Sequence, residues 1–160
     1  MKLTKEFSYP AAPDQVFGLV SDPTFREESC ARQGAHHYSV SITEEGDSTV
    51  IRIERTMPSD MPDFIKKLTG DTVGITQVET WGPADADGAR TATVLVDIHG
   101  QPAQMRGTST ISARGDGTVM SLDGDVKVSI PLIGRRIEPE VAKAITASLA
   151  DEVEYGKTKL

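Results

Sequence analysis

The chain has 160 residues, of which 38% are hydrophobic and 26% are charged, a balance typical of a globular domain. One domain over residues 1–160 accounts for this length, and a chain of this size can bury a full core. The net charge of −7 disfavours nucleic acid as a partner, because proteins that bind a phosphate backbone need a basic face. It also disfavours an anionic membrane surface as a partner.

The cysteine content and the hydropathy pattern indicate the cellular compartment of the protein. Cys30 is the single cysteine, so an internal disulfide is impossible. The first ten residues contain no apolar run of about 7–15 residues, and we therefore expect no signal peptide. No window approaches about 20 apolar residues, so no membrane span is predicted. Together these patterns predict a cytoplasmic protein.

The first elements are a strand and two short helices. Alternating apolar and polar residues predict a strand over residues 2–9. A helix should begin near Pro13, because proline suits the first helical position. Residues 22–34 predict a second short helix, which Gly34 should stop.

A period of two residues begins near residue 37 and predicts a run of strands. Most of their connectors are short and rich in glycine and aspartate, which is turn chemistry. Connections this short make successive strands antiparallel neighbours. The six predicted strands cover residues 37–43, 48–57, 73–81, 90–98, 103–114 and 118–130.

Residues 58–71 form a much longer connection between two of these strands. It contains a small helical pattern of its own over residues 62–68, with one apolar side. Loops of this length are uncommon in compact domains and are often lids or binding loops. We therefore expect this segment to act as a lid.

Near the C-terminus, apolar residues recur every four positions and predict a long helix over residues 132–155. Pro139 falls within its first turns. Proline lacks an N–H and crowds the carbonyl of the residue four positions earlier, here Arg135. We therefore expect a kink or a short break over residues 135–138, with the regular helix running from about Pro139.

The elements follow the order β-α-α-β-β-β-β-β-β-α, which predicts an α+β fold with a seven-stranded antiparallel sheet. An antiparallel sheet can bury one face, and the C-terminal helix is the predicted element long enough to cover it. A curved sheet that grips one long helix leaves a space between the two. The expected architecture is therefore a helix-grip fold.

Two stretches carry a resemblance to a known superfamily. "YPAAPDQVFGLVSDPTF" resembles the strand, proline-started helix and Asp-Pro turn of START-like (SRPBCC, helix-grip) proteins. "VSIPLIGRRIE" resembles their strand-Pro-Leu-Ile-Gly approach to the gripped helix. The superfamily includes lipid-transfer domains, polyketide cyclases/dehydratases and plant pollen allergens, and the chain looks most like one of its families of undefined function. The resemblance implies a cavity that holds an apolar or amphipathic small molecule.

Metal and nucleophile chemistry finds little support in the residues. Cys30 and the histidines His36, His37 and His99 are the available soft or imidazole ligands. Adjacent histidines in an extended chain point to opposite faces, and no metal-binding Cys or His spacing occurs. No Gly-x-Ser-x-Gly motif is present either. We predict no metal site and no cofactor.

Acid–base chemistry has one weak candidate, Glu79. It should share a strand face with Gln77 and Trp81. If that face lines the cavity, Glu79 is a buried carboxylate with a raised pKa, able to transfer protons. Alternatively, a bulge turns the strand, or Glu79 pairs with an arginine across the sheet. Arg55, if it also faces inward, would be either an ion-pair partner of Glu79 or the polar end of a ligand site.

Large apolar side chains are the stronger candidates for a ligand site. Methionine adapts to varied shapes and suits a permissive pocket, although such residues equally well fill a solid core. Val94, Val96 and Ile98 should form the inward face of the central strand. The apolar candidates are Trp81, Met57, Met61, Phe64, Met105 and Met120.

Three functions remain open at this point. The leading hypothesis is a protein that binds a lipid-like or polyketide-like molecule in the cavity, oriented by Glu79, Arg55 and Gln77. The first alternative is a cyclase/dehydratase-type enzyme that uses Glu79 as its acid–base group. The second is a non-catalytic interaction module with a solid core. The oligomeric state stays open.

Overall fold

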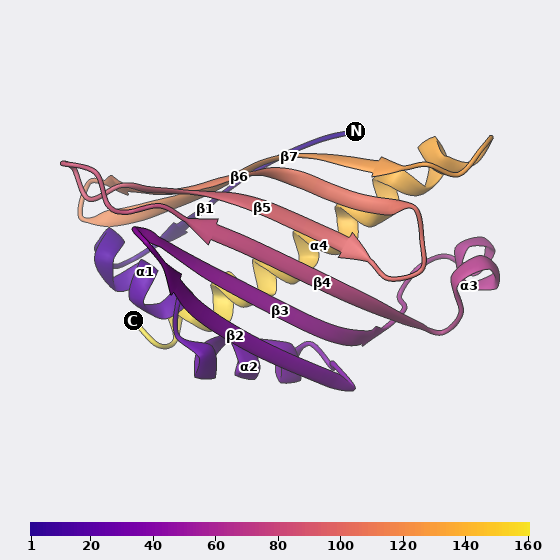
Figure 1. The fold of residues 1–160 in the computed structure, drawn as a ribbon, viewed down its shortest axis with the longest axis horizontal. Helices are drawn as coiled ribbons and strands as arrows, with labels where there is room; N and C mark the ends of the chain where they lie inside the picture. The colour runs from indigo at the N-terminus through magenta and orange to yellow at the C-terminus, as the bar shows by residue number, and fades with distance from the viewer.

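The computed structural model describes residues 1–160 as a seven-stranded antiparallel sheet with four helices (Figure 1). The predicted order of elements and the α+β class are confirmed. The strands are β1 Lys2–Tyr9, β2 His37–Glu45, β3 Ser48–Pro58, β4 Thr72–Trp81, β5 Arg90–Ile98, β6 Ala103–Arg114 and β7 Gly117–Val128. The helices are α1 Pro13–Val20, α2 Pro23–Arg32, α3 Asp63–Thr69 and α4 Gly134–Lys157.

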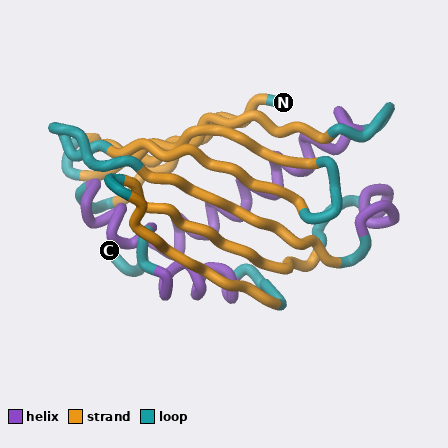
Figure 2. Tube along the Cα trace, viewed as in Figure 1, coloured by secondary structure: helices purple, strands orange, loops and turns teal.

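The sheet has the strand order β1-β7-β6-β5-β4-β3-β2, so it is a meander from β2 to β7 that β1 extends at one edge. β1 pairs with β7 along its whole length, from Lys2 opposite Asp125 to Tyr9 opposite Thr118. The two helices α1 and α2 carry the chain from one edge of the sheet to the other. The sheet curves around α4, which crosses its concave face diagonally (Figure 2).

The starts of α1 and α2 follow local chemistry. Both helices have proline near their first position, where its missing N–H costs nothing. The side chain of Asp22 caps α2 by accepting a hydrogen bond of 3.0 Å from the backbone N–H of Thr24. These signals fix where α2 begins, and therefore which of its residues turn toward the sheet.

The long helix α4 is continuous through Pro139, so the predicted break over residues 135–138 is wrong. Pro139 is the sixth residue of the helix and removes one hydrogen bond to the Arg135 carbonyl without ending the helix. The irregular backbone lies earlier, at the fully exposed Leu132, which has a φ of 72°. Gly134 then starts the helix where a Cβ would fall 2.1 Å from the Val128 carbonyl oxygen.

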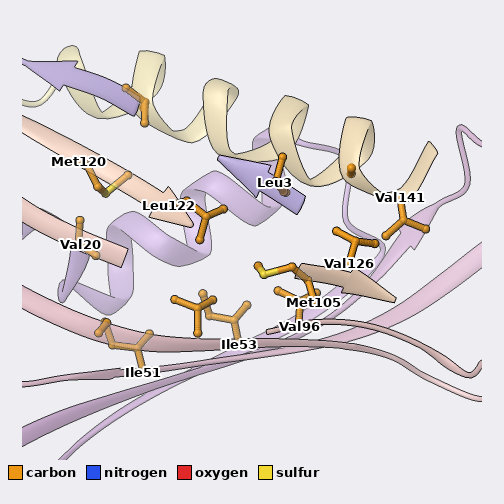
Figure 3. Close-up of a cluster of buried hydrophobic side chains, with 14 of the residues drawn as sticks. Leu3, Val20, Ile51, Ile53, Val96, Met105, Met120, Leu122, Val126 and Val141 are labelled. Carbon is orange, nitrogen blue, oxygen red and sulfur yellow. The ribbon is translucent and has the colours of Figure 1, made fainter. Parts of the chain in front are cut away.

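Buried aliphatic and methionine side chains fill much of the space between the sheet and α4. Figure 3 shows Met105 of β6 and Met120, Leu122 and Val126 of β7 on the side of the sheet where α4 and its Val141 lie. All five are buried. The short helix α3 confirms the helical pattern predicted in the long connection. No helix has the length and apolar character that crossing a membrane requires.

Candidate functional site

A cavity of about 360 Å³ lies between the concave face of the sheet and α4. Of its 29 lining residues 17 are hydrophobic, so a molecule inside it would meet mainly carbon. The walls come from the inward faces of β3 to β7, from α4, from the residues just before α3, and from single residues of α1 and α2. Val94, Val96 and Ile98 of the central strand β5 all line it. This hollow does not agree with the alternative of a solid core.

The structure brings most of the candidate site residues to this cavity. Phe64 is the exception, since it does not line the cavity and its side chain is 40% exposed. In α3 the neighbouring Ile65 turns inward instead, and the Arg136 guanidinium lies 5.2 Å from the centre of the Phe64 ring. Ligand contact by the others stays a prediction. The candidates that line the cavity are Arg55, Met57, Met61, Gln77, Glu79, Trp81, Met105 and Met120.

Strand β4 places its polar side chains on the cavity wall by simple alternation. Gln77, Glu79 and Trp81 share the inward face, with no bulge to turn the strand. Glu79 stands opposite Ile51 of β3 and Val94 of β5. Its two cross-strand neighbours are therefore apolar, and a charged partner must come from outside the sheet.

That partner is Arg26, which α2 inserts beneath the sheet. Its side chain is 2% exposed and binds Glu79 through two hydrogen bonds, 3.3 Å from Nη1 to Oε1 and 2.5 Å from Nη2 to Oε2. Nη1 also donates to the Val20 carbonyl at 3.0 Å, and Nε lies 3.4 Å from Oε2 of Glu152. Arg26 thus joins α2 to the sheet and to α4 through two carboxylates.

The other donors to Glu79 come from its own strand. Trp81 Nε1 donates to Oε1 at 2.9 Å, and Gln77 Nε2 donates to Oε2 at 2.6 Å. Both oxygens of the carboxylate therefore have two partners each. A buried carboxylate with this many donors is fully satisfied in its ionised form.

The expectation of a raised pKa for Glu79 is wrong. Burial by itself raises the pKa of Glu79, but the charge of Arg26 outweighs it, together with hydrogen bonds from Arg26, Trp81 and Gln77. The net result is a pKa below the ordinary value for glutamate. The pKa of Arg26 is raised, because the charges of Glu152 and Glu79 overcome the opposing effect of its burial.

Arg55 has a different environment on the same wall. It stands on β3 opposite Ile75, and its Nη2 reaches Oε1 of Gln77 at 3.4 Å. Its Nε is buried without any hydrogen-bond partner. Arg55 is not the partner of Glu79, because Gln77 lies between the two in the chain of hydrogen bonds.

Sequence reasoning missed Arg26, and the only available signal was weak. Arg26 lies four residues before Cys30 and one after Phe25, and all three are buried in α2. Arginine on a short helix usually points to solvent, so this spacing becomes informative only when the buried face of α2 is known. The strand pattern was enough to name Glu79 as a candidate, whereas nothing in the sequence identified Arg26 as its partner.

Cys30 and the histidines take no part in the cavity wall. Burial raises the pKa of the Cys30 thiol despite the opposing effects of the nearby Arg55, so the thiol stays protonated and a poor nucleophile. His99 Nε2 bonds the Thr76 hydroxyl at 2.6 Å at an exposed position. No group of three or more His, Cys, Asp or Glu side chains is placed to hold a metal ion.

Residues 4–160 match the protein family described as "Protein of unknown function (DUF2505)". No curated protein matches the chain in sequence. Solved structures share its fold. TTHA0849 from Thermus thermophilus is 18% identical, with a TM-score of 0.64 over 96% of this chain and 92% of that chain.

Two further structures carry the superfamily in their names. A STAR-related lipid transfer protein from Xanthomonas axonopodis is 15% identical, with a TM-score of 0.62 over 96% of this chain and 84% of that chain. A START superfamily protein from Mycobacterium smegmatis is 14% identical, with a TM-score of 0.60 over 99% of this chain and 97% of that chain. These likenesses confirm the START-like fold.

Proposed function

The chain belongs to the DUF2505 family, a family with the START-like fold, and we propose that this member binds a hydrophobic or amphipathic small molecule between its sheet and α4. The observation that carries the proposal is the cavity of about 360 Å³ with its mainly apolar wall. Small-molecule sites commonly have volumes of about 300–1,000 Å³ and a few polar groups in an apolar lining. Arg55, Gln77 and Glu79 are the polar groups of the lining that we expect to orient the ligand.

Affinity would come mainly from the burial of ligand carbon. Removing apolar surface from water contributes about 25 cal/mol per Å², from which the costs of binding are subtracted. The aliphatic face of β5 and the methionines Met105 and Met120 offer a surface that adapts to the shape of its guest. The name of the Xanthomonas axonopodis structure, a lipid transfer protein, supports a lipid-like ligand.

The ligand would enter between α4 and the segment before α3. Ala144 and Ala147 of α4 line the cavity and are exposed, which marks an opening on this side. Met57 and Met61 flank the same cavity from the residues around the start of the 58–71 connection. This connection would act as the lid, because its first residues, 58–61, line the cavity.

Binding fits the polar groups better than catalysis does. A general acid or base works best with a pKa near the working pH. Glu79 instead has a lowered pKa and is held by Arg26, Trp81 and Gln77. Its role would be to keep the cavity wall in place.

Trp81 makes the proposal easy to test, because it is the only tryptophan, is 1% exposed and lines the cavity. The purified protein would be titrated with fatty acids, fatty alcohols and polycyclic aromatic compounds while Trp81 fluorescence and the melting temperature are followed. We expect saturable changes with at least one of these classes. Native mass spectrometry of protein from its own host would show what co-purifies.

A matched pair of variants tests where the molecule binds. Ala144→Phe narrows the opening, whereas Lys143→Phe adds the same ring at an exposed neighbouring position that does not line the cavity. We expect Ala144→Phe to weaken binding and Lys143→Phe to leave it unchanged. Equal binding by both variants, or no response of the unmodified protein to any compound, would contradict the proposal.

A further inference from the structure

Two arginines line the cavity, and they differ in their partners. Arg26 binds the carboxylates of Glu79 and Glu152. Arg55 forms no ion pair, and its one side-chain hydrogen bond within the sheet is the long contact of 3.4 Å to Gln77. Nε of each arginine is buried without a hydrogen-bond partner, but only Arg26 has carboxylates within ion-pair distance. Arg55 is therefore a cation on the cavity wall without a counter-charge, since its side-chain neighbours Gln77 and the protonated Cys30 thiol are both uncharged.

The carboxylates around the cavity cannot supply the missing partner. Glu79 and Glu152 are engaged by Arg26. Asp151 lies 3.4 Å from Nε of Arg32 at the surface, and Asp60 is exposed at the rim. Arg55 is partly exposed, but its Nε is buried, and buried donors normally have acceptors. The pattern calls for an anionic group that arrives with the ligand.

From this geometry, and resting on the proposed binding function, we propose that the ligand is an amphipathic acid whose carboxylate binds Arg55. A guanidinium presents its N–H groups as a planar fork, which matches the two oxygens of a carboxylate. Gln77 would orient the Arg55 guanidinium. Its Oε1 accepts from Arg55, and its position is fixed because its Nε2 donates to Glu79. The hydrocarbon part of the ligand would lie along the apolar faces of β5 to β7.

The charges of the cavity favour a single negative charge over a doubly charged head group. Glu79, Glu152 and Asp151 all line the same space. Glu79 and Glu152 are paired with Arg26, and Asp151 with Arg32, so Arg55 is the one cation of the cavity lining that no carboxylate contacts. A carboxylate would pair with Arg55 one to one, whereas a phosphate monoester would bring a second negative charge close to these acids. An amine would meet the unpaired guanidinium of Arg55 and be repelled.

Three probes with the same hydrocarbon chain separate these cases: decanoic acid, 1-decanol and decylamine. Their affinities would be measured at pH 8 by calorimetry and by Trp81 fluorescence. Hydrogen bonds to charged groups predict that the unmodified protein binds decanoic acid about 10- to 100-fold more tightly than 1-decanol. Decylamine should bind most weakly of the three.

Two variants on the same strand assign the preference to Arg55. Arg55→Gln removes the charge, and we expect decanoic acid to fall to the affinity of 1-decanol, with 1-decanol itself unchanged. The control is Arg52→Gln, because Arg52 is 51% exposed and pairs with Glu54 on the other face of β3. This control should keep the full preference for the acid. Retained binding of 1-decanol also shows that Arg55→Gln is folded.

The outcomes distinguish this inference from the function on which it rests. If the alcohol and the acid bind equally well, or the amine binds best, the inference is wrong while the binding function stands. The same holds if Arg55→Gln keeps its preference for the acid. If none of the three probes binds the unmodified protein, both this inference and the binding function proposed for such molecules fail.

Discussion

The two cavity arginines show how one wall can serve two purposes. Arg26 comes from α2, is almost completely buried, and is held by carboxylates from β4 and α4. Arg55 comes from β3, is partly exposed to the cavity, and has no carboxylate. The same side-chain chemistry is therefore part of the scaffold at one place and available to a ligand at the other.

This difference has an energetic consequence. Forming a buried ion pair costs desolvation free energy. Removing one partner destabilises the fold strongly, because the remaining charge then stays unpaired in the interior. An arginine without a partner contributes little to folding, and its removal eliminates a cost. Function and stability should therefore separate cleanly between the two positions.

The largest expected effect is that of Arg26→Met, which leaves Glu79 and Glu152 without their cation. Removing one member of a buried ion pair costs about 3–5 kcal/mol, and we expect a loss of that size in urea unfolding. Arg32→Met in the same helix is the control, since Arg32 is 50% exposed and should change stability by less than about 1 kcal/mol. Similar losses in the two variants would contradict a structural role for Arg26.

An intermediate effect is expected for Glu79→Gln, with a characteristic dependence on pH. Because folding lowers the pKa of Glu79, its ionised form stabilises the protein above the unfolded pKa of about 4.5. That contribution is lost as the pH falls through the lower folded pKa. We expect Glu79→Gln to cost about 2 kcal/mol at pH 7, since hydrogen bonds to a charged group are replaced by neutral ones.

The gap in stability between the unmodified protein and Glu79→Gln should then shrink steadily below pH 4.5. Urea unfolding at a series of pH values between about 3 and 7 measures it. A gap that stays constant over this range would show that Glu79 does not titrate with folding, and would place the stabilising charge elsewhere.

The smallest effect on stability is expected for Arg55→Met. Replacing a cation that lacks a partner by an apolar side chain of similar length should leave stability unchanged or raise it by up to about 1 kcal/mol. Thermal unfolding without any ligand measures this. A loss of about 2 kcal/mol or more, the size expected when a buried hydrogen-bonded charge is removed, would mean that Arg55 has a structural partner. That result would weaken its assignment to a ligand.

The strand pattern around Glu79 can be read from the amino-acid order alone, because a strand has a fixed period of two. Once β4 is recognised, Gln77, Glu79 and Trp81 must share a face. The same rule places Arg55 with the inward side chains of β3. The ionisation of Glu79 cannot be read in this way, since it depends on Arg26, which lies 53 residues away in the chain.

Helical faces were less predictable than strand faces. In α3, Phe64 and Ile65 are adjacent, and both look apolar in the sequence. Only the packing of α3 decides that Ile65 is buried while Phe64 points outward beside Arg136. The continuity of α4 through Pro139 was also a matter of context, because packing against the sheet offsets one missing hydrogen bond near the start of the helix.

The sequence by itself determined the order of the elements, the antiparallel sheet and the long final helix, because these depend on local periodicity and on short connections. It also determined which residues of each strand share a face. Only the tertiary structure decided that Arg26 enters the cavity wall, that Glu79 is ionised and that Arg55 is left without a partner. Charged side chains form ion pairs when folding brings them close together in space. Their separation along the chain does not reveal which pairs will form.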